Sequence, residues 1–273
     1  MKPEEIRKLT TEATDQLIAA LREGRSETLT HFLAAMAQFR RYSLGNIMLI
    51  AAQKRDATRV AGFRTWNKLG RFVKKGEKGI VVLAPIMRPK PENLDGFELE
   101  ESRNPAGFRP VYVFDISQTD GQELPVICDV NGDPREYPRR LSNFVVRLGI
   151  VIEYSADIAP ALGTSAGGKI SLLPGQSPAQ EFVTLAHELA HELMHHTERR
   201  NTISRCVRET EAEAVAFVIS QAIGLETTSA AKDYIELYRG DATLLTESLE
   251  LIQSTANSIL EGIGAEEKSS PAG

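Results

Sequence analysis

The stretch EFVTLAHELAHELMHH, residues 181–196, decides how the second half of this chain is interpreted. Its apolar residues recur at the spacing of one helical face, which predicts a long helix over residues 179–196. His187 and His191 are four residues apart, and residues at that spacing project from the same side of a helix. Two imidazoles can therefore converge on one metal ion, with Glu188 beside them, about 100° around the helix.

Two histidines need a third protein ligand from elsewhere in the chain. His195 continues the four-residue series, but on a straight helix it lies ~12 Å from His187, too far for both to bind one ion. His196 is excluded on the same ground. Both residues are interpreted as a polar helix end near the negative pole of the helix dipole.

A second amphipathic helix, predicted over residues 204–223, supplies the candidates for the third ligand. It carries Glu209, Glu211 and Glu213. Glu209 and Glu213 share one face, whereas Glu211 projects about 200° from Glu209. Either Glu209 and Glu213 or Glu211 alone can therefore face the metal. For any two of the three glutamates, the alternative is a solvated acidic face.

The order of these two helices resembles that of gluzincin metallopeptidases, in which an acidic ligand follows the zinc-binding helix. Four residues further on, that group places an acidic or amide residue that supports a ligand histidine. The resemblance implies Glu209 as the third ligand and Glu213 as the supporting residue, with Glu213 and then Glu211 as alternative ligands. Glu188 can then take a proton from a water that the ion has acidified and pass it to a leaving amine. Zn²⁺ is the expected ion, and Mn²⁺ or another divalent ion is the alternative.

Around this motif the pattern predicts a helix over 137–148, strands over 149–154 and 169–173, a glycine-rich turn at 163–168, and a helical region over 229–262. The segment GGKISLL, residues 167–173, lies where zinc peptidases of this kind place the edge strand that pairs with a peptide. An ordinary sheet strand is the alternative.

The first half begins with helices predicted over 4–23 and 27–39 and a third after Ser43, followed by strands at 79–84 and 109–114. A mobile surface excursion is expected over 88–107. We therefore predict an α+β protein of two domains: a helix-plus-small-sheet DNA-binding domain over 1–122 and a zincin-like metallopeptidase domain over 123–262. Residues 263–273 are expected to be a disordered tail.

Charge is distributed unevenly between these halves. The chain carries a net charge of −5, yet residues 31–90 hold 13 lysines and arginines against 2 acidic residues. A basic block in an acidic protein indicates a surface that binds a polyanion.

Within this block, the segment RVAGFRTWNKLGRFVKKGEKG, residues 59–79, interleaves cations with Phe63, Trp66 and Phe72. Single-stranded nucleic acid needs cations for its phosphates and aromatic faces for its bases. The alternative is that the aromatic residues belong to the core of a small sheet and the lysines to a solvated face. The predicted DNA-binding residues are Arg64, Trp66, Lys68, Arg71, Lys74, Lys75 and Lys78.

Six short motifs resemble the N-terminal domain of ArdC-type antirestriction proteins. They are YSLGN (42–46), GFRTW (62–66), LGR (69–71), KGEKG (75–79), AP (84–85) and VFDI (113–116). In that family a single-stranded-DNA-binding domain precedes a metallopeptidase domain that carries His-Glu-x-x-His. The C-terminal half also resembles the IrrE/ImmA regulatory peptidases. The resemblance implies a role in protecting incoming mobile-element DNA from restriction.

Two other functions remain open at this stage. One is an IrrE/ImmA-like regulatory metallopeptidase that cleaves a DNA-bound repressor, and the other is a non-enzymatic DNA-binding protein with a structural metal. The expected partners are single-stranded DNA and a protein substrate such as a repressor or a restriction component. No stretch approaches the ~18 apolar residues that a membrane span requires, so we expect a cytoplasmic protein with no membrane partner.

Overall fold

Helices and short strands occur largely in separate groups along the chain, and the expected α+β fold class is confirmed. The computed structural model describes residues 3–23, 26–86, 107–122, 134–195, 197–225 and 242–264. Residues 1–16 and 45–124 form one compact unit, and residues 17–44 and 125–273 form a second. The predicted mobile excursion at 88–107 lies almost wholly outside the described residues, and so does nearly all of the predicted tail.

A three-stranded antiparallel sheet forms the centre of the first unit, in the order β1–β4–β3. The strands span Val60–Gly62 (β1), Ile80–Ile86 (β3) and Gly107–Asp115 (β4). A two-stranded sheet pairs β2 (Arg71–Val73) with β5 (Thr119–Gly121), and the short helix α4 (Phe63–Lys68) leads into β2. The predicted strands over 79–84 and 109–114 therefore form, whereas sequence analysis missed β1, α4, β2 and β5 because each has only a few residues.

Helix α3 (Leu44–Gln53) closes one edge of this sheet. Its Asn46 side chain donates to the carbonyl of Leu83 and accepts from the Leu83 amide at 2.9 and 2.7 Å. Gln53 makes the same pair of bonds with the backbone of Val81. Backbone groups of β3 that would otherwise stand open at the sheet edge are thereby satisfied.

Asp115 fixes the corner where β4 ends. Its carboxylate accepts hydrogen bonds from the backbone amides of Thr58, Arg59 and Ser117. Burial alone would raise the pKa of Asp115, but these bonds outweigh it and hold the pKa below its usual value. Gln118 completes the corner by accepting from the Asp115 amide. The VFDI motif thus has a structural role in the first unit.

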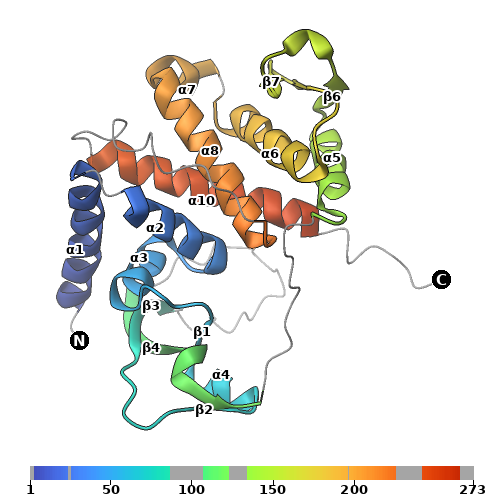
Figure 1. Ribbon diagram of the computed structural model, residues 1–273. Helices are drawn as coiled ribbons and strands as arrows, with labels where there is room; N and C mark the ends of the chain where they lie inside the picture. Colours follow the sequence, from blue (N-terminus) through green and yellow to red (C-terminus); the bar gives the residue numbers. More distant parts are fainter. Residues whose placement is uncertain are drawn as a thin grey trace, which may run out of the picture. The chain divides into compact units, whose positions relative to one another are not determined.

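The second unit is mainly helical. Its helices are α2 (Ser26–Gln38), α5 (Tyr137–Arg147), α6 (Pro178–Met194), α7 (Thr197–Thr202), α8 (Arg205–Ala222) and α10 (Ala242–Gly264); α1 (Pro3–Arg22) begins in the first unit and ends in this one. α8 packs against α6, α10 and α2, and α10 also contacts α5 (Figure 1). The face that α8 presents to these neighbours is apolar, and Ala212, Val215 and Ile219 are fully buried.

A three-stranded sheet covers one side of α6, in the order β6–β8–β7. β6 (Val151–Tyr154) runs parallel to β8 (Lys169–Leu172), and β7 (Gly163–Ser165) runs antiparallel to it. The strand that sequence analysis placed at the edge is therefore the central strand of this sheet. The edge strands are β6 and β7, and β7 lies within the predicted glycine-rich turn.

Helix α2 differs from the expected organisation, because it belongs to the second unit and not to the domain predicted over residues 1–122. Leu29, Phe32, Leu33 and Met36 are buried, and the helix packs against α8. No helix among the described residues is long and apolar enough to cross a membrane.

Candidate metal centre

Helix α6 carries the two predicted histidine ligands. It begins after Ser177, whose hydroxyl accepts a hydrogen bond from the amide of Gln180, and Pro178 occupies its first turn. Its apolar residues face the core of the unit, whereas His187 and His191 are half-buried on the side toward α8. The helical spacing has therefore placed both imidazoles on one face, as predicted.

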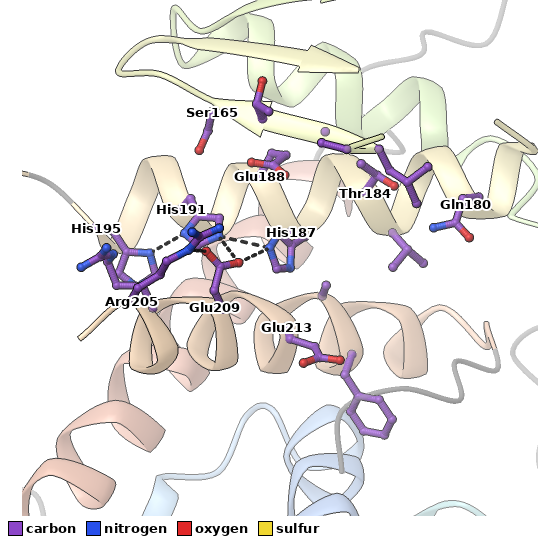
Figure 2. Close-up of a pocket in the computed structure, with 18 of the residues that line it drawn as sticks. Ser165, Gln180, Thr184, His187, Glu188, His191, His195, Arg205, Glu209 and Glu213 are labelled. Carbon is purple, nitrogen blue, oxygen red and sulfur yellow. Dashed lines mark hydrogen bonds and ion pairs between the residues drawn. The ribbon is translucent and has the colours of Figure 1, made fainter. Parts of the chain in front are cut away.

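Helix α8 brings Glu209 to these imidazoles. The Nε2 atoms of His187 and His191 lie 3.1 Å apart, and each lies 3.5 Å from Oε2 of Glu209 (Figure 2). All three ligand atoms fall within 4.8 Å of one another. Hydrogen bonds from His187 and His191 hold the pKa of Glu209 far below its usual value. The site is thus two imidazoles and an ionised carboxylate facing one point.

Glu188 points from the same helix toward β7, on the other side of the imidazoles (Figure 2). Only 8% of its surface is exposed. Burial raises the pKa of Glu188 above its usual value, although the two histidines and a hydrogen bond from Ser165 oppose the rise. A buried carboxylate with a raised pKa is suited to accepting and releasing a proton.

A cavity of about 770 Å³ contains this group of side chains, within the size range of ligand-binding clefts. All three residues of β7 line it, together with Thr184 of α6. Glu213 lines it from α8, one turn beyond Glu209, and its predicted support of a ligand histidine stays a prediction.

Gly163 allows β7 to approach Glu188 closely. A Cβ atom at this position would lie 2.6 Å from Cγ2 of Thr184 and 2.8 Å from Cγ of Glu188. We expect Gly163→Ala to lower the free energy of unfolding by about 1–3 kcal/mol, because β7 and α6 must separate. Denaturant unfolding followed by circular dichroism measures this loss. Gly264→Ala is the control, since nothing lies within 4 Å of its Cβ position; equal stability of the two variants would contradict the close packing.

His195 has a role that sequence analysis missed. It does not belong to the group of potential ligands, in agreement with its exclusion, and it caps the C-terminal end of α6 as predicted, but it is only 5% exposed and has buried polar partners. Its Nδ1 lies 2.9 Å from Nδ1 of His191, and its Nε2 lies 2.9 Å from Oε2 of Glu211. Burial lowers the pKa of His195. The four-residue spacing from His191 was the available signal, but it was considered only for metal ligation.

Glu211 is completely buried and does not belong to the group of potential metal ligands. Arg199 and Ser248 donate to its Oε1, and His195 contacts its Oε2. Burial alone would raise the pKa of Glu211, but these partners outweigh it and hold the pKa below its usual value. Glu211, the last alternative ligand from sequence, is thus a buried partner of His195.

In the first unit, the structure corrects one predicted DNA-binding residue. Trp66 is 2% exposed, and its Nε1 donates to the carbonyl of Phe114, so it is a core residue and offers no face for a base. Arg71 donates to the backbone and side chain of Thr119 and to the carbonyl of Gln122, which ties β2 to the segment around β5. The other predicted cations are exposed: Arg64, Lys68, Lys74, Lys75 and Lys78.

Exposed aromatic residues nevertheless lie on this unit. Phe63 and Phe72 belong to the predicted segment, and Phe108 and Tyr112 are exposed on β4. The last two are four residues apart on one strand, so they lie on the same face of the sheet. Both residues lie outside the basic segment 59–79, so its pattern of cations and aromatic residues does not point to them.

Comparison with known proteins agrees with this architecture. Residues 7–114 match the family model described as the N-terminal domain of anti-restriction factor ArdC. Across 95% of its length the chain is 24% identical to an uncharacterized protein of Bacillus anthracis. It spans about half of that relative, 52% of its length.

Two crystal structures of the antirestriction ArdC protein from the R388 plasmid share the fold. The metal-free structure has a TM-score of 0.57 at 21% identity and covers 94% of this chain and 98% of ArdC. The Mn(II)-bound structure has a TM-score of 0.56 at 20% identity and covers 93% of this chain and 98% of ArdC. Residues 7–114 thus match the N-terminal domain of ArdC, and the chain as a whole shares the fold of the antirestriction ArdC protein.

Proposed function

We propose that this chain is a single-stranded-DNA-binding, metal-dependent peptidase of antirestriction type that protects mobile-element DNA. The observation that carries the enzymatic part is the convergence of His187, His191 and Glu209, with buried Glu188 beside them. The match to the ArdC N-terminal domain supports the antirestriction part.

The three converging side chains fit a divalent ion. Two imidazole nitrogens and one carboxylate oxygen are a ligand set of hydrolytic zinc sites, and the same donors accept manganese. The Mn(II)-bound ArdC structure supports a divalent ion as the cofactor without favouring zinc. A divalent ion held here supplies a Lewis acid that polarises a peptide carbonyl and acidifies water.

Glu188 is the residue of this chain that moves the proton. Its carboxylate accepts a proton from the attacking water and delivers it to the leaving amine, for which its raised pKa is suited. Strand β7 holds the substrate in this proposal, because it is an edge strand and all its residues line the same cavity. An extended peptide added to that edge would lie across Glu188.

The peptidase proposal is tested by Glu188→Gln, which keeps the size of the side chain but removes its ability to accept the proton. We expect cleavage of a proteome-derived peptide library to fall at least about 100-fold while metal content stays at the wild-type level. Glu250→Gln, exposed on α10, is the matched control. Undiminished cleavage by Glu188→Gln would refute the role of Glu188. Absence of cleavage by the wild-type protein would favour a structural metal.

The first unit supports the proposed binding of single-stranded DNA. Its exposed aromatic residues offer faces on which bases stack, and the neighbouring exposed lysines offer charge to the phosphates. Lys75 and Lys78 lie in the connection between β2 and β3, close in sequence to exposed Phe72. The DNA-binding surface we propose comprises Phe63, Arg64, Lys68, Phe72, Lys75, Lys78, Phe108 and Tyr112.

A further inference from the structure

The cavity around the potential metal ligands has a cationic end. Three arginines line it from α7 and α8: Arg200, Arg205 and Arg208. Arg205 lies one turn before Glu209 on α8, near the C-terminal end of α6 (Figure 2). Arg208 donates to the carbonyls of Arg200 and Ile203, which holds the turn from α7 into α8 at this end of the cavity.

Carboxylates balance only part of this positive charge. Among the described residues, Arg205 is the only one of the three arginines with an ion pair, at 3.6 Å from its Nε to Oε1 of Glu209. Arg200 and Arg205 are exposed, and Arg208 is half-buried. A guanidinium can donate two parallel hydrogen bonds to one carboxylate. The cationic end can therefore bind an acidic group that enters the cavity.

The opposite end of the cavity is apolar. Four residues line it, from the segment before β7 and from α6 and α8: Leu162, Val183, Ala216 and Phe217. Ala216 and Phe217 lie seven and eight residues beyond Glu209 on α8, about 10–12 Å along the helix axis. The potential metal ligands therefore lie between the cationic end and the apolar end.

Strand β7 sets the direction in which a peptide can cross the cavity. A Cβ atom at Gly163 would lie 2.6 Å from Cγ2 of Thr184, beside the apolar end. Beyond β7, the amides of Gly167 and Gly168 donate to Glu192, about two turns further along α6. β7 therefore runs from the apolar end toward the cationic end. Because antiparallel pairing is the more stable and the more common kind, an added peptide has its N-terminal part at the cationic end.

We infer that this cavity selects peptides with an acidic side chain before the scissile bond and an apolar side chain after it. The inference rests on the proposed peptidase function and names its substrate class. Arg205 lies about 6 Å from Glu209 along α8, the length of about two extended residues. The acidic side chain therefore belongs within two residues before the scissile bond, and the apolar side chain follows that bond toward Val183 and Phe217.

A nucleic-acid backbone fits the same cavity less well. Glu188, Glu209 and Glu213 line the cavity together with the arginines, and they repel a ligand that carries a negative charge at every nucleotide. Among the described lining residues, the apolar end has no cation to pair with further phosphates. A peptide with one carboxylate and one apolar side chain complements both ends.

Cleavage of a proteome-derived peptide library by the full chain, supplied with Mn²⁺ or Zn²⁺, tests this selection. Mass spectrometry of the products gives the residues on each side of every cleaved bond. We expect Asp or Glu to be enriched within two residues before the bond and apolar residues after it. In synthetic peptides taken from these sites, replacing the acidic residue by its amide should lower kcat/KM about 10- to 100-fold.

Reversal of one charge at the cationic end should change the preference. Arg200→Glu is suitable because Arg200 is exposed and lies outside the group of potential metal ligands. We expect the ratio of kcat/KM for an acidic peptide to that for its lysine counterpart to fall at least about 10-fold. Arg139→Glu is the matched control, exposed on α5 and absent from the cavity lining, and should keep the wild-type ratio. Circular dichroism and metal content check that both variants are intact.

Cleavage without an acidic preference, or with the acidic residue after the bond, would overturn the inference and leave the peptidase function intact. A wild-type ratio in Arg200→Glu would do the same. If the wild-type protein cleaves no peptide, the proposed function fails, and capture of the library on immobilised Glu188→Gln protein decides the inference. Enrichment of acidic peptides that Arg200→Glu abolishes would support it, whereas capture without enrichment would overturn it.

Nucleic acid is the remaining occupant to test. Binding of labelled oligothymidine is measured by fluorescence anisotropy for the wild type, Arg200→Glu and Arg139→Glu. We expect the two variants to bind it alike. If Arg200→Glu alone loses oligothymidine binding and keeps the wild-type peptide preference, the arginines serve nucleic acid and the inference is wrong.

Discussion

Replacement of His191 by alanine is expected to remove divalent-metal binding while the second unit stays folded. Among the described residues, His191 belongs to a group of three potential metal ligands with His187 and Glu209. Its Nε2 lies 3.5 Å from Oε2 of Glu209 and 3.1 Å from Nε2 of His187. Structural zinc sites with four ligands bind with about 10–16 kcal/mol, so one ligand contributes about 2.5–4 kcal/mol. That loss corresponds to about 70- to 900-fold in affinity.

The measurement is metal content after dialysis, together with calorimetric titration of Mn²⁺ and Zn²⁺. His31→Ala provides a matched control, because His31 is exposed on α2 and lies outside the potential ligand group. Its metal content should equal that of the wild type. If His191→Ala retains a full equivalent of metal, the ligand assignment is wrong.

Trp66 and Phe72 are expected to give opposite results when each is replaced by alanine. Trp66 is buried and donates to the carbonyl of Phe114, so Trp66→Ala should lower the free energy of unfolding of the first unit by about 3–5 kcal/mol. Phe72 is 61% exposed, so Phe72→Ala should change this free energy by less than about 0.5 kcal/mol. Phe72→Ala removes a ring on which a base can stack, so it should weaken binding of single-stranded DNA by about 1–3 kcal/mol.

Denaturant unfolding and fluorescence anisotropy with a labelled oligothymidine measure the two quantities separately. A stable Trp66→Ala protein with weakened DNA binding would restore Trp66 as a stacking residue and contradict its assignment to the core. Unchanged DNA binding by Phe72→Ala would remove Phe72 from the proposed surface. Comparison of the variants also controls for unfolding, since only Trp66→Ala should lose structure.

The parts of the site that sequence predicted are those set by local geometry. His187, Glu188 and His191 belong to one helix, and a spacing of four fixes their directions before any tertiary contact forms. Glu209 required one further step, the resemblance to gluzincins, because two helices must dock in a particular rotation. The structure brings Glu209 to the histidines, and its role as ligand stays a prediction.

The sequence-based predictions that proved wrong depend on tertiary contacts with residues distant in sequence. Trp66 has cationic neighbours in the sequence, which is typical of a base-stacking residue. In the structure it is buried and bonded to the backbone of β4. His195 reads like a polar helix end, but α8 and Arg199 surround it with a carboxylate and a cation. Strand β7 has three residues and no periodicity to detect, so a turn was predicted where the sheet edge lies.

The division of the chain has a consequence for its synthesis on the ribosome. α2 is made early but packs against α8, while the sheet of the first unit is completed from residues 45–124. At ~5–20 residues per second, the chain between these helices takes about 10–30 s to appear. The first unit can fold within that interval, but the apolar face formed by Phe32, Leu33 and Met36 awaits its partner. A C-terminal fragment starting at residue 125 would lack α2 and would expose the surface of α8 that packs against it.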